Sequence, residues 1–134
     1  MRKLYVLCLV LVLFCTIVEA AKTFPMTASS IVPAARGQVE IDKDKNGNIR
    51  VKMEVEHLAN PQNLTPAATV YVVWLQQKGE NPQNQGQLKV DKELKARFET
   101  VTPSTSFDLF VTGERDNGAR VPDGPEVLRA SIQP

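Results

Sequence analysis

The segment 49–56, IRVKMEVE, alternates strictly between apolar and charged side chains. Successive side chains of a β-strand point to opposite faces, so this alternation predicts a strand with one buried face and one face in water. On a helix the same charges would be distributed around every side. We therefore expect a chain built on β-sheet, with a core along one face of this strand.

Further β-rich segments are separated by glycine, proline and polar residues. Thr69–Leu75, TVYVVWL, is apolar almost throughout and rich in β-branched and aromatic residues, which is typical of a central strand covered on both faces. Asp91–Ala96 could form one helical turn at most, and no other segment has helical periodicity. The remaining strands are predicted at 37–41, 87–90, 96–101, 106–112 and 127–132.

About seven short strands with this punctuation predict an all-β fold, a single immunoglobulin-like antiparallel β-sandwich. Residues 1–20 are assigned to a signal peptide, 21–36 to an extended lead-in with a possible edge strand, and 37–134 to the sandwich. Trp74 is the expected core anchor. The other expected core residues are Tyr71, Val72, Leu109, Val111 and the odd-numbered residues of 49–55.

The stretch DKDKNGN after the first strand fits two structures. Asp42, Asp44 and Asn46 match the first, third and fifth ligand positions of a calcium-binding loop, with Gly47 at the sixth, but Met53 occupies the twelfth, where a glutamate is required. Asn-Gly between alternating segments is typical of a type I′ hairpin turn. We favour the hairpin, and weak calcium binding by the same three residues is a compatible alternative.

Residues 1–20 have the pattern of a secretory signal peptide. Arg2 and Lys3 precede the apolar run Leu4–Val18. Val18 and Ala20 place small side chains at the −3 and −1 positions of a cleavage site, and cleavage is expected after Ala20 or Ala21. The run is shorter than the about 20 apolar residues of a spanning helix, so cleavage is favoured over a retained membrane anchor. This predicts a periplasmic or secreted protein, with no membrane insertion after cleavage.

Both cysteines, Cys8 and Cys15, lie within this segment. The processed domain is therefore expected to have no disulfide, thiol nucleophile or thiolate ligand. The chain has 16 basic and 15 acidic residues and a formal net charge of +1. Without a basic stripe, neither nucleic-acid binding nor an electrostatic membrane contact is expected.

Few residues are candidates for chemistry. His57 is the single histidine, so a copper or zinc site is not expected. A loop at Gly113–Glu126 gathers four carboxylates, which could form an acid–base pair, although a solvated loop of mixed charge is favoured. These carboxylates are Glu114, Asp116, Asp123 and Glu126. No catalytic residue, cofactor or metal is predicted.

Four segments resemble a known family. YVVWLQ, GQLKV, FDLFVTGE and PDGPEVL, within residues 69–132, follow the order of the extracytoplasmic β-domain of bacterial anti-sigma-K factors. VPAARGQVEI and DKNGN are similar to segments of small uncharacterised exported proteins of acidobacteria. The resemblance implies a β-domain outside the cytoplasm. Counterparts of the family's zinc ligands and spanning helix are not recognised, so sigma-factor binding is not expected.

Together these features predict an exported, non-enzymatic binding or structural module. Its partner would be a protein or glycan of the cell envelope. One alternative is a calcium-stabilised adhesion or envelope module, with Asp42, Asp44 and Asn46 as ligands. A second is a hydrolase that uses the carboxylates of the 113–126 loop.

Overall fold

The computed structural model describes residues 21–133, and the predicted signal peptide lies outside them. None of the helices in the described part is long and apolar enough to cross a membrane. These residues form eight strands and one short 3₁₀ helix. The elements are β1 (Lys22–Ala28), β2 (Arg36–Lys43), β3 (Ile49–Glu56), η1 (Pro61–Asn63), β4 (Val70–Gln76), β5 (Gln83–Leu88), β6 (Ala96–Thr102), β7 (Phe107–Glu114) and β8 (Glu126–Ile132).

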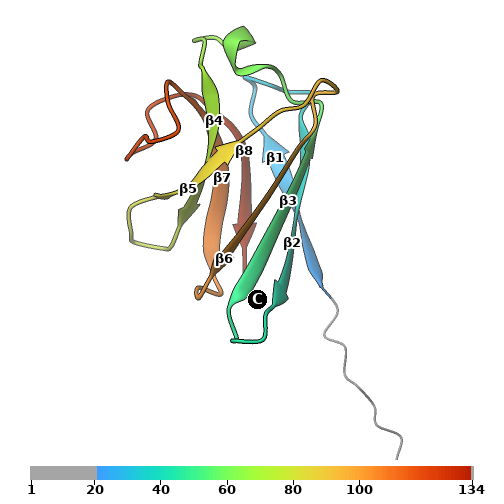
Figure 1. The fold of residues 1–134 in the computed structure, drawn as a ribbon, viewed down its shortest axis with the longest axis vertical. Helices are drawn as coiled ribbons and strands as arrows, with labels where there is room; N and C mark the ends of the chain where they lie inside the picture. Colours follow the sequence, from blue (N-terminus) through green and yellow to red (C-terminus); the bar gives the residue numbers. More distant parts are fainter. Residues whose placement is uncertain (1–20, 134) are drawn as a thin grey trace, which may run out of the picture.

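The strands form one antiparallel sheet in the order β5-β4-β7-β8-β1-β2-β3-β6, curled almost into a barrel (Figure 1). The predicted all-β antiparallel class is confirmed, but the immunoglobulin-like two-sheet sandwich is wrong. The reason is β1, in which Lys22–Met26 pair with β2 while Thr27 and Ala28 pair with β8. This strand joins what would otherwise be two sheets. It lies within the sheet, so the edge position expected for the lead-in is also wrong.

The barrel is completed by side chains between the two end strands, β5 and β6. Thr100 Oγ1 on β6 donates a hydrogen bond of 2.9 Å to Gln85 Oε1 on β5. The ring of Phe98 lies against Gly86, where an added Cβ would be 3.5 Å from Phe98 Cε2. We call these two contacts the β5–β6 seam.

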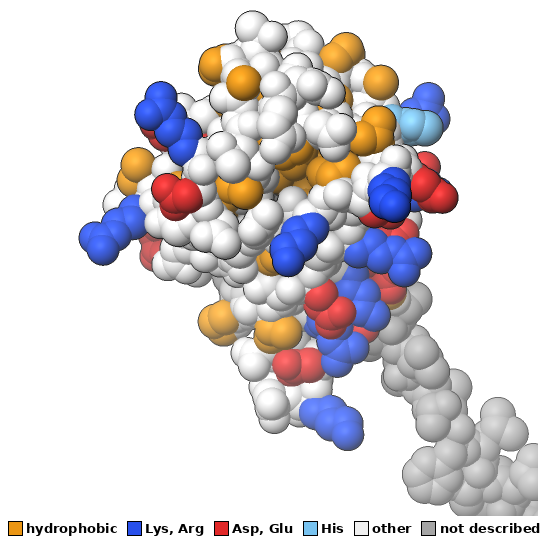
Figure 2. Space-filling model, turned by 45° about the horizontal axis from the view of Figure 1, so that its top comes forward, with side chains coloured by type: hydrophobic (Ala, Val, Ile, Leu, Met, Phe, Trp, Pro, Cys, Tyr) orange, Lys and Arg blue, Asp and Glu red, His pale blue; other side chains and the backbone are white. Residues whose placement is uncertain are grey.

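The core lies on the face of β3 that the alternation predicted. The odd-numbered residues of Ile49–Glu56 are buried inside the barrel and the even-numbered ones point outward. Figure 2 shows basic and acidic side chains interspersed on the outer surface. Strand β5 begins at Gln83, whereas the prediction placed this strand at 87–90. The sequence did not indicate the earlier start, because the first residues of β5 are mostly amides with no apolar alternation.

Strand β4 is covered on both faces, as predicted. Tyr71, Val73 and Leu75 point into the barrel. Trp74 is fully buried, but with Val72 it lies on the outer face.

We call Val72, Trp74 and Phe110 the outer cluster. The rings of Trp74 and Phe110 stack with centroids 6.5 Å apart. The prediction that Trp74 anchors the central core is therefore wrong. A second, smaller apolar cluster outside the barrel buries it.

The predicted β2–β3 hairpin is confirmed, but its turn is not type I′. Asp44 N donates to Asn48 O at 2.8 Å, and Gly47 N donates to Asp44 O at 3.2 Å. Within this turn only Gly47 has a positive φ, of 79°, whereas a type I′ turn needs two such residues. Asp44 Oδ1 accepts hydrogen bonds from Asn46 N (2.8 Å) and Asn48 N (2.9 Å), which stabilises the longer turn.

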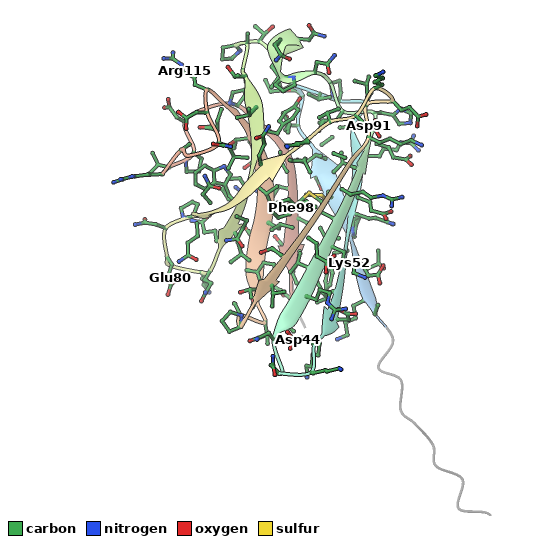
Figure 3. All side chains as sticks on the ribbon, in the orientation of Figure 1. Asp44, Lys52, Glu80, Asp91, Phe98 and Arg115 are labelled. Carbon is green, nitrogen blue, oxygen red and sulfur yellow. The ribbon has the colours of Figure 1, made fainter. Side chains whose placement is uncertain are left out.

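A second turn repeats this arrangement at Asp91–Lys95. Asp91 Oδ1 accepts hydrogen bonds from Glu93 N (2.8 Å) and Lys95 N (3.0 Å). Leu94 takes the place of the glycine, with a φ of 60°. Figure 3 shows Asp44 and Asp91 at opposite ends of the molecule. The aspartate, rather than the glycine, is therefore the feature common to the two turns.

We expect Gly47→Ala to lower the free energy of unfolding by about 1–2 kcal/mol, because a side chain in the left-handed region is strained. A Cβ at Gly47 would have no atom within 4 Å, so the effect is conformational rather than steric. Gly47→Asn should lose less, since asparagine tolerates this region. Urea unfolding of both variants checks the prediction, which equal losses for alanine and asparagine would contradict.

Candidate functional site

The loop after β7, residues 115–125, folds back over the outer face of the barrel beside β4 and β5 (Figure 1). Asn84 on β5 holds it there, because its Nδ2 donates to Asn117 O at 2.9 Å and to Ala119 O at 2.8 Å. Ala119 packs against the outer cluster. This segment, which we call the β7–β8 loop, thus covers Trp74.

Glu114, one of the four carboxylates of the hydrolase alternative, is buried with 4% of its surface exposed. Its Oε1 accepts a hydrogen bond from Asp123 N at 2.8 Å, and its Oε2 accepts one from Gly124 N at 2.8 Å. Thr112 Oγ1 donates to Oε2 at 3.0 Å and accepts from Trp74 Nε1 at 2.8 Å. Three donors therefore hold this carboxylate, which links Trp74 to the end of the β7–β8 loop.

Two of the other three carboxylates have partners of their own. Asp116 Oδ1 accepts a hydrogen bond from Gly118 N at 2.8 Å. Glu126 Oε1 accepts from Arg129 Nη2 at 2.6 Å. The side chain of Asp123 is exposed. Within residues 21–133, no hydrogen bond joins two of the four carboxylates. Asp116 and Asp123 lie on the β7–β8 loop, whereas Glu114 ends β7 and Glu126 begins β8.

Arg129 crosses the outer face of β7 and β8. Its Nη1 donates to Asp108 Oδ2 at 2.8 Å, and its guanidinium lies 4.2 Å from the centre of the Phe110 ring. Its hydrogen bonds to Glu126 and then to Asp108 favour the charged form and raise the pKa of Arg129. This ion cluster and the aromatic ring together flank the outer cluster.

Tyr71 fixes the segment before β4. Its hydroxyl donates to Ala59 O at 2.8 Å, and the residue is fully buried. Burial raises the pKa of Tyr71 to about 12, because the phenolate is poorly solvated there. The neutral hydroxyl holds the 59–62 segment against the barrel.

The raised pKa of Tyr71 makes stability pH-dependent. In the unfolded chain a tyrosine pKa is about 10, so the stabilisation is complete below pH about 10 and is lost as the pH rises to about 12. We expect a loss of about 2 kcal/mol across this window. Urea unfolding at several pH values measures it. In Tyr71→Phe the corresponding part of the pH slope should be absent, although the variant loses about 1 kcal/mol at neutral pH through the hydrogen bond to Ala59. Identical slopes would contradict the prediction.

The predicted calcium ligands lie in the β2–β3 hairpin. Asp42 Oδ2 is 3.8 Å from Arg50 Nη1, and its Oδ1 is buried without a hydrogen-bond partner among the described residues. Asp44 Oδ1 is occupied by two amides of the turn, and Asn46 is exposed. In the part of the chain that the structure describes, no group of three or more His, Cys, Asp or Glu could hold a metal ion. Calcium binding at these three residues stays the alternative prediction.

A shallow hollow of about 330 Å³ lies between η1, the start of β4 and the end of β5. We call it the polar hollow. Sequence reasoning missed it, although the amide-rich stretch 76–87 leads into one wall. The polar residues that line the hollow are Asn60, Gln62, Thr69, Gln87 and Lys89.

The architecture is that of an antiparallel, nearly closed eight-stranded barrel. No protein-family model matches the chain, and no curated protein matches it. Among solved structures, it is similar to the crystal structure of the clock protein EA4, with a TM-score of 0.57 and 12% identity over 83% of this chain and 92% of that chain. At this identity the similarity shows the fold alone. The resemblance to anti-sigma-K factors stays a prediction.

Proposed function

We propose that this protein is a non-enzymatic binding or structural module that acts in the periplasm or as a secreted protein. The observation that carries the proposal is the use of the loop carboxylates. Glu114, Asp116 and Glu126 are each bonded to a group that shapes the β7–β8 loop or its flanks. Carboxylates that accept hydrogen bonds from the chain itself stabilise its surface, whereas acid–base catalysis needs groups that can exchange protons with a substrate.

Two further features support this proposal. The signal-peptide pattern of residues 1–20 favours export. The resemblance of residues 69–132 to the extracytoplasmic domain of anti-sigma-K factors supports a sensor-like binding role, without sigma-factor binding. The partner would be a protein or glycan of the cell envelope.

The full chain, expressed in a bacterium with a C-terminal tag, tests export and binding separately. N-terminal sequencing of the periplasmic fraction should find a product that begins at Ala21 or Lys22. An unprocessed product confined to the cytosol would overturn export. Chemical cross-linking of the exported protein should recover a specific envelope component, and recovery of the bait alone would overturn a binding role.

The hydrolase alternative is tested with the same purified protein. Asp123 is the loop carboxylate with an exposed side chain and no hydrogen bond to it within the described residues. Hydrolysis of ester, amide or glycoside substrates that is lost in Asp123→Asn would overturn the non-enzymatic proposal. Equal background rates for the two proteins would support it.

A further inference from the structure

The walls of the polar hollow are held in place by the chain's own hydrogen bonds. On one side, Pro61 O accepts bonds from Leu64 N at 3.2 Å and from Ala68 N at 2.9 Å, and the Tyr71 hydroxyl holds Ala59 at 2.8 Å. On the other side, Gln87 Oε1 accepts a bond of 3.3 Å from Asn117 Nδ2 in the β7–β8 loop. The backbone around the hollow is fixed in this way, so it loses little conformational entropy when a ligand binds.

Several polar side-chain groups that line the hollow make no hydrogen bond within the described residues. The side chains of Asn60, Gln62 and Thr69 are exposed and make no hydrogen bond within residues 21–133. Lys89 is likewise exposed and belongs to no ion pair in that part of the chain. The Gln87 amide nitrogen remains available, because only its oxygen is used. Amides and hydroxyls both donate and accept hydrogen bonds, so this set suits a ligand that does the same.

The lining of the hollow also contains apolar residues, and its described residues include no acidic one. Pro61, Val70 and Val90 contribute half-buried apolar surface between the polar groups. No Asp or Glu is among the described residues that line the hollow, which makes it a poor site for a cation. A sugar ring offers several hydroxyls at its edge and C–H groups on its faces. It therefore matches the alternation of polar and apolar groups along these walls.

We propose that the polar hollow binds a hydroxyl-rich oligosaccharide, either neutral or with a carboxylate that Lys89 would pair with. The inference rests on the proposed function as a binding module and names the ligand class for it. The open, shallow shape fits a chain of sugars that passes across the surface better than an enclosed small molecule.

The test is titration of the exported full chain, as processed by the cell, with cellohexaose and with an oligogalacturonate, followed by amide NMR shifts and calorimetry. We expect at least one sugar to bind with a Kd of about 1 mM or tighter. The shifts should be confined to the segments around Asn60–Gln62, Thr69–Tyr71 and Gln87–Val90. If neither sugar shifts these amides, or if the shifts are spread over the whole barrel, the inference is wrong.

The double variant Asn60→Ala, Gln62→Ala removes two side chains that make no internal hydrogen bond in the described part of the chain, so its fold should be unchanged. Its affinity should fall about tenfold or more. Gln38→Ala is the matched control, since Gln38 is an exposed amide on β2 away from the hollow. Equal affinity of the double variant and the control would overturn the inference. Capture of a protein partner with no sugar bound would also overturn it, while leaving the proposed function intact.

Discussion

Gly124→Ala is expected to lower the free energy of unfolding by about 3 kcal/mol or more, and the variant should be largely unfolded at moderate urea. A Cβ at Gly124 would lie 1.5 Å from Gly113 O, which no rotamer change can relieve. Neither backbone is free to retreat. Gly113 N donates to Pro125 O at 2.9 Å, and Gly124 N donates to Glu114. Circular dichroism during urea unfolding measures the loss.

Gly118→Ala in the same loop is the matched control. Gly118 is exposed, and an added Cβ would meet only Asp116 Oδ1, at 3.3 Å. The change in unfolding free energy should stay within about 0.5 kcal/mol. If Gly124→Ala is tolerated as well as Gly118→Ala, the close approach of the two backbones does not exist in solution.

Glu114→Gln is expected to cost about 2–3 kcal/mol while keeping the shape of the side chain. The carboxylate accepts from two backbone amides and from the Thr112 hydroxyl. An amide group must turn its NH₂ toward one of these donors, which leaves buried polar groups unsatisfied. Trp74, the single tryptophan, reports the result, because a loosened β7–β8 loop exposes the indole and shifts its emission to the red.

Asp123→Asn is the control for this variant. It removes a nearby charge, but only the backbone N–H of Asp123 takes part in the bond to Glu114. Stability within about 0.5 kcal/mol of the parent is expected, with unchanged tryptophan emission. Equal losses in the two variants would indicate that the net charge of the loop, rather than the buried acceptor, holds it in place.

Local pattern predicted the strands well where one face is apolar and the other charged. Strand β3 occupies the predicted residues, and β4 differs by one residue at each end. The closure of the sheet could not be read from any one strand. It depends on β1 bonding to β2 at one end and to β8 at the other, a pairing between segments about 100 residues apart. Alternation shows that a strand has two faces but does not identify its neighbours.

The candidate site was only partly predictable for a related reason. Sequence reasoning placed Glu114 and Asp123 on one loop, whereas in the structure Glu114 ends β7 and Asp123 lies in the β7–β8 loop. The sequence could not show that Glu114 bonds to the backbone of this loop while Thr112 connects it to Trp74. An apolar strand such as β4 also gives no indication of which face belongs to the larger core.

Seven of the joints between neighbouring strands are ladders of main-chain hydrogen bonds, and the eighth is the β5–β6 seam. Separating β5 from β6 breaks no ladder of main-chain hydrogen bonds, so we expect the wall to part there at lower free energy than at the seven ladders. Such an opening would expose the apolar interior of the barrel to water. It would also expose the unpaired edges of β5 and β6. Resistance to self-association would then depend on the contacts of the β5–β6 seam.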